Sequence, residues 1–189
     1  GTVTPDIARE TGLPEDCVVA IGGHDHVIGA LASGVFNDNS LMDSMGTAEG
    51  LVLPLPTRTR DRRFVDWTLE QTLIRIDGAN RYFFCGGLFT SSAAIEWFRN
   101  LFAQGFDYKQ MMEDAGKVAI GAEGTLFVPH LRIASAPDNY ARPGGAFMRM
   151  STESDRAIPY RALLEGLAFD ARHIAERLLE FLDPAAPSN

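Results

Sequence analysis

Two histidines flank one aspartate near the N-terminus, on a loop that two glycines open. Residues 22–26 read Gly-Gly-His-Asp-His and directly follow the apolar run Cys-Val-Val-Ala-Ile. A helix is expected to begin at Asp25, where outward-facing amides and the positive end of the helix dipole favour an ionised carboxylate. Such a carboxylate suits a general base or a metal ligand, and it equally suits a plain helix cap. The spacing alone leaves these alternatives open.

The spacing of His24 and His26 is also compatible with two ligands of one metal ion. Side chains at i and i+2 of an extended segment point the same way, so both imidazoles can face one ion. A metal site needs a third ligand, and the other histidines, His130 and His173, have no recognisable partner spacing. The sequence therefore predicts no metal site.

A second candidate for chemistry is the stretch Asp-Ser-Met-Gly-Thr-Ala-Glu-Gly at residues 43–50. A strand that turns at Gly46-Thr47 and returns as another strand presents amide N–H groups and a hydroxyl at one point. Such a nest can hold phosphate oxygens without a lysine, although a Gly-Thr hairpin is usually only a turn. The chain contains neither GxxxxGK[ST] nor GxGxxG, so neither of those two glycine-rich nucleotide loops is supported.

The elements that must position these residues follow from caps, turn residues and hydrophobic periodicity. Helices are predicted at residues 4–12, from about Asp25 to Gly34, from Ser91 or Ser92 to Phe102, at 107–116 and at 159–182. Strands are predicted at residues 17–21 (buried), 40–45, 49–53, 72–76 and 81–85, with residues 77–80 as a hairpin turn. Residues 130–145 are rich in turn formers and predict an irregular segment.

The predicted C-terminal helix carries the clearest periodicity of the chain. Apolar residues recur every three or four positions and form one stripe over about six turns: Leu163, Leu164, Leu167, Ala171, Ile174, Leu178 and Leu182. The predicted order is helix, strand, helix, several strands in hairpins and then helices, which indicates a mixed α/β fold rather than a repeating βαβ ladder. A change of character at residues 36–40 is the best candidate for a domain boundary.

The composition is that of an ordinary globular protein, with 189 residues, 46% of them hydrophobic. The net charge of −8 argues against a nucleic-acid or anionic-membrane partner, since both reward clustered Lys and Arg. Cys17 and Cys85 lie in apolar runs and predict two buried free thiols in a reducing compartment. There is no apolar run of about 20 residues and no signal-peptide pattern, so a cytoplasmic location is expected.

Together these segments resemble the FGGY family of carbohydrate kinases, which includes xylulose, gluconate and glycerol kinases. The run into Gly-Gly-His-Asp-His is similar to the approach to the family's catalytic aspartate, and SLMDSMGTAEGL is similar to the hairpin that opens its C-terminal domain. GGLFTSSAAIEWFRN is similar to the small-residue segment before a tryptophan-bearing helix. The last stretch is similar to the C-terminal signature region. The four stretches, in the family's order, are residues 4–26, 40–51, 86–100, and 124–147 followed by 160–174.

The resemblance implies an α/β fold of two actin-like lobes of the ribonuclease-H type with a cleft between them. Residues 1–38 then correspond to the end of the N-terminal lobe, and residues 39–189 to part of the C-terminal, nucleotide-binding lobe. The sugar or polyol is expected mostly on the first lobe, and ATP with Mg²⁺ mostly on the second. The implied activity is ATP-dependent phosphorylation of a sugar, polyol or sugar-acid hydroxyl.

The resemblance also implies roles for individual residues. Asp25 matches the catalytic base, which accepts the proton of the attacking hydroxyl as the γ-phosphoryl group departs. Gly46 and Thr47 match the turn that contacts the ATP phosphates, and Ser92 falls where several members have a glycine near the nucleotide.

The two histidines and the helix signature receive roles in the same way. His26 stands where some members place a residue that touches the sugar, and His24 is expected to orient groups or to line the cleft wall. Glu165-Gly166 matches the helix signature and is interpreted as packing.

Several positions depart from the family pattern. Ile133-Ala134-Ser135 stands in place of a Gly-Glu-Arg-like triplet, Arg149 replaces a glycine, and Ile158-Pro159 replaces a polar–apolar pair. Family members are also more than twice as long, so most of the sugar pocket and the adenosine motif are not expected in this chain. The alternative is a truncated, non-catalytic remnant that acts as a binding protein. The sequence does not name the sugar and leaves a homodimer open.

Overall fold

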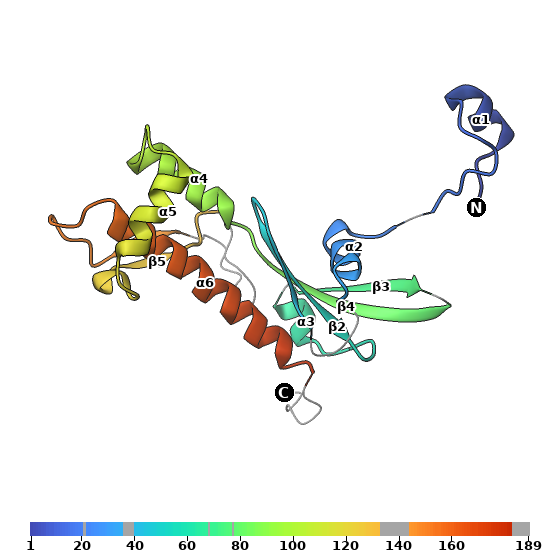
Figure 1. Cartoon of the computed structure of the whole chain (residues 1–189). Helices are drawn as coiled ribbons and strands as arrows, with labels where there is room; N and C mark the ends of the chain where they lie inside the picture. Colours follow the sequence, from blue (N-terminus) through green and yellow to red (C-terminus); the bar gives the residue numbers. More distant parts are fainter. Residues whose placement is uncertain (21, 36–39, 68, 77, 133–143, 183–189) are drawn as a thin grey trace.

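A computed structural model describes residues 1–20, 22–35, 40–67, 69–76, 78–132 and 144–182. Its helices are α1 (Pro5–Thr11), α2 (Asp25–Ala32), α3 (Arg63–Asp66), α4 (Ser92–Phe102), α5 (Tyr108–Lys117), the 3₁₀ helix η1 (Ala122–Gly124) and α6 (Ala157–Leu179). Its strands are β1 (Met42–Met45), β2 (Glu49–Leu55), β3 (Glu70–Ile76), β4 (Ala79–Leu88), β5 (Leu126–Val128) and β6 (Ala146–Met148). Figure 1 shows an elongated arrangement, with α1 apart at one end and the sheet between α2 and α6.

The central sheet has the order β1-β2-β4-β3, and every neighbouring pair is antiparallel. Strand β2 is buried along its whole length because its side chains alternate between two covered faces. On one face α2 packs over the sheet, and this cluster consists of Val27, Ala30, Val35, Val52, Phe83 and Cys85. On the other face the C-terminal half of α6 and α3 pack against Leu51, Leu53 and Phe84. In Figure 1, α2 lies above the sheet and α3 lies below it.

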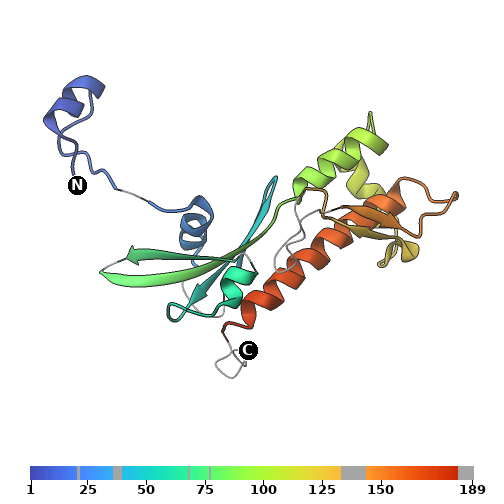
Figure 2. The ribbon, with the colours of Figure 1, turned by 180° about the vertical axis from the view of Figure 1, so that it is seen from behind.

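Helix α6 connects the sheet to a second hydrophobic cluster. Seen from behind, it runs from the α4–α5 end of the molecule to the sheet (Figure 2). Its first half places Leu163 and Leu167 in a cluster with α4 and α5, and its second half places Ile174 and Leu178 under the sheet. The predicted apolar stripe is confirmed, with Leu164, Ala171 and Leu182 packed against these clusters as partly buried members.

Most of the predicted helices and hairpins are confirmed. Helix α1 lies between an N-cap at Thr4 and a left-handed C-cap at Gly12. Helix α2 begins at Asp25, and α4 has Ser91 at its N-cap. The predicted hairpins are present as β1–β2 and β3–β4, with Ile76 paired to Ala79 across a turn that includes Gly78.

The predicted buried strand at residues 17–21 is wrong. Within the described residues, Val18 makes one isolated bridge with Thr2, and the side chains of Val18 and Val19 are 76% and 55% exposed. The run has the composition of a buried strand, but the described part of this chain offers no sheet for it to join. Cys17 in the same run is only half-buried, whereas Cys85 is buried as predicted, and both thiols are free.

Some expectations fall on residues outside the described ranges. They include the centre of the domain boundary at residues 36–39 and the segment at residues 133–143, with its Ile133-Ala134-Ser135 departure. None of the helices in the described part of the chain combines the length and the apolar composition needed to cross a membrane.

Candidate functional site

The Gly-Gly-His-Asp-His motif forms the entry to α2. His24 is the N-cap residue and Asp25 is the first residue of the helix. One carboxylate oxygen of Asp25, Oδ1, accepts a hydrogen bond from the backbone N–H of His26 at 2.9 Å and lies 3.5 Å from His24 Nδ1. The side chain of Asp25 is 87% exposed. The motif therefore presents an accessible carboxylate at the positive end of a helix, as predicted.

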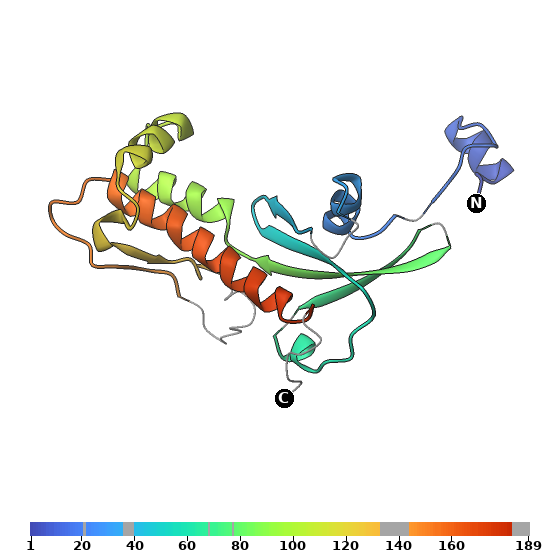
Figure 3. The same ribbon diagram turned by 60° about the horizontal axis from the view of Figure 1, so that its bottom comes forward.

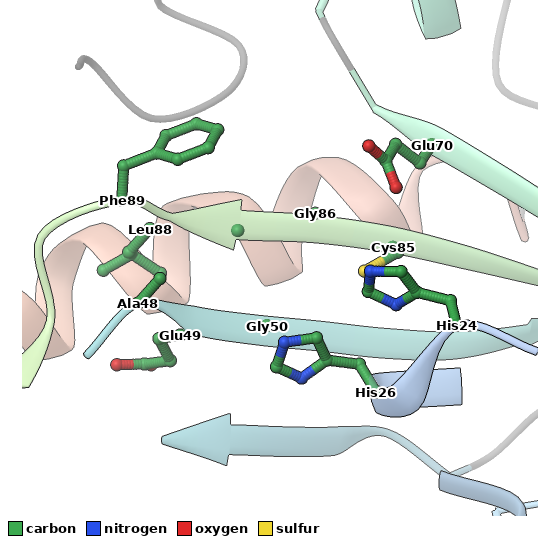
Figure 4. Close-up of a pocket in the computed structure, with 11 residues that line it drawn as sticks. His24, His26, Ala48, Glu49, Gly50, Glu70, Cys85, Gly86, Leu88 and Phe89 are labelled. Atoms are coloured by element: carbon green, nitrogen blue, oxygen red, sulfur yellow. The ribbon is translucent and has the colours of Figure 1, made fainter. Parts of the chain in front are cut away.

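The two imidazoles lie together over the sheet. Their ring centroids are 5.3 Å apart, and the rings are inclined by 26°. The ring of His26 rests on Gly50, because a Cβ at that position would approach His26 Nδ1 to 3.0 Å. Figure 4 shows both rings projecting from α2 toward β2 and β4. Glycine at position 50 therefore allows the motif to sit against the strand.

A pocket of about 160 Å³ joins this motif to the β1–β2 turn. His24 and His26 lie at one end of the pocket, and Ala48, the residue after Thr47, lies at the other (Figure 4). The remaining lining residues come from β2, β3, β4 and the residue after β4: Glu49, Gly50, Glu70, Cys85, Gly86, Gly87, Leu88 and Phe89. Residues of both candidate motifs thus line one cavity, although Asp25, Gly46, Thr47 and Ser92 themselves are not among its lining residues.

Cys85 lines the pocket but is not a nucleophile at neutral pH. Burial raises the pKa of its thiol to about 11, and the negative charges of Glu70 and Asp25 contribute to the same shift. The thiolate is the nucleophilic form of cysteine, so a protonated thiol acts here as a small apolar wall.

The Gly46-Thr47 turn is bound to the first residues of α4. The N–H of Ser92 donates to the carbonyl of Gly46 at 3.0 Å, and the N–H of Ala93 donates to the carbonyl of Thr47 at 3.3 Å. Figure 3 shows the tip of the β1–β2 hairpin beside the start of α4. The structure therefore brings together Gly46, Thr47 and Ser92, the three residues for which the resemblance predicts a role near the nucleotide.

Glu49 and Ser91 were not assigned to the site from the sequence. Glu49 is the first residue of β2 and is 4% exposed, and Ser91 Oγ donates a hydrogen bond to its Oε2 at 2.5 Å. Burial raises the pKa of the Glu49 carboxyl above its ordinary value, and the bond from Ser91 partly opposes this shift. An acidic residue before an apolar run gives no sequence signal of burial, so only the structure reveals the pair.

The helix signature of α6 makes contacts that fit a packing role. Glu165 accepts hydrogen bonds from the N–H of Gly121 and from Arg161 Nε, on the side of α6 that faces η1. A Cβ at Gly166 would lie 2.4 Å from the carbonyl oxygen of Phe127 in β5, so only glycine allows this approach.

The other histidines lie outside the pocket. His130 Nε2 is 3.6 Å from Asp170 Oδ1, and both side chains are largely buried. Within the described ranges, no three or more His, Cys, Asp or Glu side chains are grouped so that they could hold a metal ion.

Comparison with known proteins identifies relatives along nearly the whole chain. The chain is 29% identical over 169 residues to a xylulose kinase of Staphylococcus epidermidis, which covers 89% of this chain and 33% of that protein. The crystal structure of xylulose kinase from Rhodospirillum rubrum superposes with a TM-score of 0.80 and 28% identity over 99% of this chain and 36% of that one. The structure of Plasmodium falciparum glycerol kinase with ADP superposes with a TM-score of 0.72 at 21% identity, over 94% of this chain and 34% of that one, which shows a common fold.

The chain thus spans about a third of the length of these relatives. Its fold is part of the actin-like ATPase fold of sugar kinases. Residues 41–182 match the C-terminal domain of the FGGY family of carbohydrate kinases. The chain therefore belongs to the FGGY family of carbohydrate kinases.

Proposed function

We propose that the protein carrying this chain transfers the γ-phosphoryl group of ATP to a hydroxyl of a sugar, polyol or sugar acid. The family and its xylulose, glycerol and gluconate kinase members support this reaction class. The observation that carries the proposal for this chain is one pocket that His24 and His26 line at one end and Ala48 lines at the other. The candidate base, Asp25, stands between the two histidines in the sequence, and the candidate phosphate turn, Gly46-Thr47, directly precedes Ala48.

In this proposal Asp25 is the general base. Its exposed carboxylate accepts the proton of the substrate hydroxyl while that oxygen bonds to the γ-phosphorus and the bond to the bridging oxygen of ADP breaks. Asp25 is the first residue of α2, and its exposed side chain leaves the carboxylate open to a substrate hydroxyl. His26 then contacts the substrate, and His24 orients the carboxylate, since its Nδ1 lies 3.5 Å from Asp25 Oδ1.

The Gly46-Thr47 turn and Ser92 hold the phosphates of the nucleotide. Phosphoryl transfer depends mainly on positioning and on stabilisation of charge, which backbone N–H groups and a hydroxyl can supply. Mg²⁺ usually binds through substrate phosphates with one or two carboxylates, so it needs no cluster of protein ligands and would enter with the nucleotide.

The proposal is tested with Asp25→Asn in the protein expressed from its complete open reading frame. ADP release is measured with a panel of pentoses, hexoses, polyols and sugar acids. Loss of the base should lower kcat by roughly 10²–10⁴-fold, while binding of ATP stays within about twofold of the wild type. Asp6→Asn is the matched control, because Asp6 is also an exposed first-turn aspartate but lies on α1, away from the pocket.

Unchanged turnover in Asp25→Asn would contradict the assignment of the base. A wild-type protein that binds ATP but releases no ADP with any substrate of the panel would instead favour the non-catalytic alternative.

A further inference from the structure

Glu49 is a buried carboxylate beside the proposed phosphate turn. It opens β2, where it pairs with Met45 of β1 and Leu88 of β4, and its side chain is 4% exposed. Ser91, which is 1% exposed, donates its hydroxyl hydrogen to Glu49 Oε2 across 42 positions of the sequence. The bond therefore ties the first residue after the turn to the residue before α4.

The Ser91 hydroxyl donates to Glu49 and does not cap the N-terminus of α4. A serine at the N-cap normally accepts a hydrogen bond from an N–H group of the first helical turn, but Ser91 has no such side-chain bond. The N–H groups of Ser92 and Ala93 donate instead to the carbonyls of Gly46 and Thr47. The hairpin turn thus caps α4, and the Glu49–Ser91 bond closes the contact from the side.

This contact sets the direction of the amides in the turn. In a planar trans peptide, a carbonyl and the N–H that follows it point in opposite directions. Because the carbonyls of Gly46 and Thr47 point at α4, the N–H groups of Thr47 and Ala48 point away from it. Residues 46–48 are exposed, so these successive amides are presented on the open side of the turn, where an anion can approach.

Stability alone does not explain a carboxylate at position 49. Besides Ser91, the groups that act on the pKa of Glu49 are Asp43 of β1 and Asp170 of α6, both of which are acids. A buried charge surrounded by acids rather than by a cation is unfavourable, and a neutral residue of similar shape would be more stable. The residue is therefore better explained by what its hydrogen bond holds in place.

We propose that Glu49 is a positioning residue for nucleotide binding, which acts through Ser91 to lock the Gly46-Thr47 turn onto the start of α4. The inference rests on the proposed role of this turn at the ATP phosphates. In this role Glu49 acts on the nucleotide indirectly, because it fixes the orientation of the amides that contact the phosphates. The expected consequence is a selective effect on ATP.

Three variants test the lock: Glu49→Ala, Ser91→Ala and Glu49→Gln, each in the protein from its complete open reading frame. Loss of the buried Glu49–Ser91 hydrogen bond should raise the KM for ATP about tenfold in each alanine variant, with the KM for the sugar changed less than about twofold. The double alanine variant should be no worse than either single one, because both remove the same bond. Glu49→Gln should restore most of the affinity, since its amide oxygen can still accept from Ser91 and its NH₂ can donate to Asp43.

Asp107→Ala is the control for a merely structural effect. Asp107 accepts from Gln110 N in the capping box of α5, so its loss weakens another helix start outside the pocket. It should lower stability and leave the KM for ATP unchanged. A rise in the KM for ATP in Asp107→Ala that equals the rise in Glu49→Ala, or an unchanged KM for ATP in Glu49→Ala, would overturn the inference.

Hydrogen exchange separates this inference from the proposed function. If the wild-type protein releases no ADP, the proposed function fails, but the lock is still measurable in the backbone amides of Gly46, Ser92 and Ala93, which donate hydrogen bonds within the turn and across the contact. Glu49→Ala should accelerate their exchange at least about tenfold, whereas Glu49→Gln and Asp107→Ala should not. Equal exchange in the wild type and in Glu49→Ala would contradict the lock, whatever the activity.

Discussion

Asp25 and Glu49 are two carboxylates in opposite surroundings near the same pocket. Asp25 is exposed at the N-terminus of α2, whereas Glu49 is buried beside Asp43 and Asp170. A proton acceptor needs access to substrate, and a fixed hydrogen-bond acceptor needs exclusion from water. The two environments therefore suit the two roles that we propose.

The raised pKa of Glu49 predicts a specific dependence of stability on pH. Between the ordinary carboxyl pKa and the raised one, the folded protein binds more protons than the unfolded chain, so the free energy of unfolding falls as pH rises through this range. Glu49→Gln removes this titration and should be more stable than the wild type at pH 7, with the difference vanishing near pH 4. Urea unfolding at a series of pH values measures it. A constant difference between the two proteins at all pH values would show that burial does not shift this group.

At the scale of elements, close packing of α6 against β5 depends on one residue without a side chain. The carbonyl of Phe127 occupies the space that a Cβ at position 166 would need. The neighbouring residue, Glu165, holds the N–H of Gly121 at the entry to η1. Glu165 and Gly166 thus dock α6 onto β5 and onto the segment before it.

Gly166→Ala should therefore destabilise the protein, although alanine favours helices. Overpacking against a backbone atom is expected to lower the free energy of unfolding by about 1–3 kcal/mol. Gly116→Ala on α5 is the matched control, because a Cβ there meets no atom within 4 Å. It should raise stability by about 0.5–1 kcal/mol. Urea denaturation of both variants measures the contrast, and equal effects would refute the packing argument.

At the scale of the whole molecule, α6 contributes residues to two hydrophobic clusters and so connects them. Leu163 lies in the cluster with α4 and α5, and Ile174 lies in the cluster under the sheet. The chain has two tryptophans, and each packs against a different cluster, Trp97 against the first and Trp67 against the second. The fluorescence of each indole therefore reports one half of the molecule.

We expect the two halves to unfold together. Leu163→Ala and Ile174→Ala should each lower the free energy of unfolding by about 2–5 kcal/mol, because each removes most of a fully buried side chain and leaves a cavity in its place. Measured in Trp67→Phe and Trp97→Phe backgrounds, either substitution should shift the transitions of both indoles. Leu179→Ala, on the same helix but 49% exposed, should have a much smaller effect. Independent transitions of the two indoles would show that α6 does not couple the clusters.

Local signals account for the features of the fold that could be predicted. A cap such as Thr4, a turn such as Gly46-Thr47 and an apolar stripe such as that of α6 are encoded by neighbouring residues, so one sequence suffices to find them. The strand predicted at residues 17–21 failed because burial is not a local property: an apolar run needs a partner sheet, and within the described residues this run pairs only with the short segment of residues 1–3.

The sequence by itself determined which residues can do chemistry at the entry to α2 and at the β1–β2 turn, because residue types and short spacings define those motifs. Only the tertiary structure decided that both motifs open onto one pocket, that Gly50 makes room for His26, and that Glu49 is buried against Ser91. The physical reason is distance along the chain: pairing of β2 with β4 brings positions 49 and 88 together, and α4 begins just beyond. A hydrogen bond between residues 42 positions apart exists only once that sheet has formed.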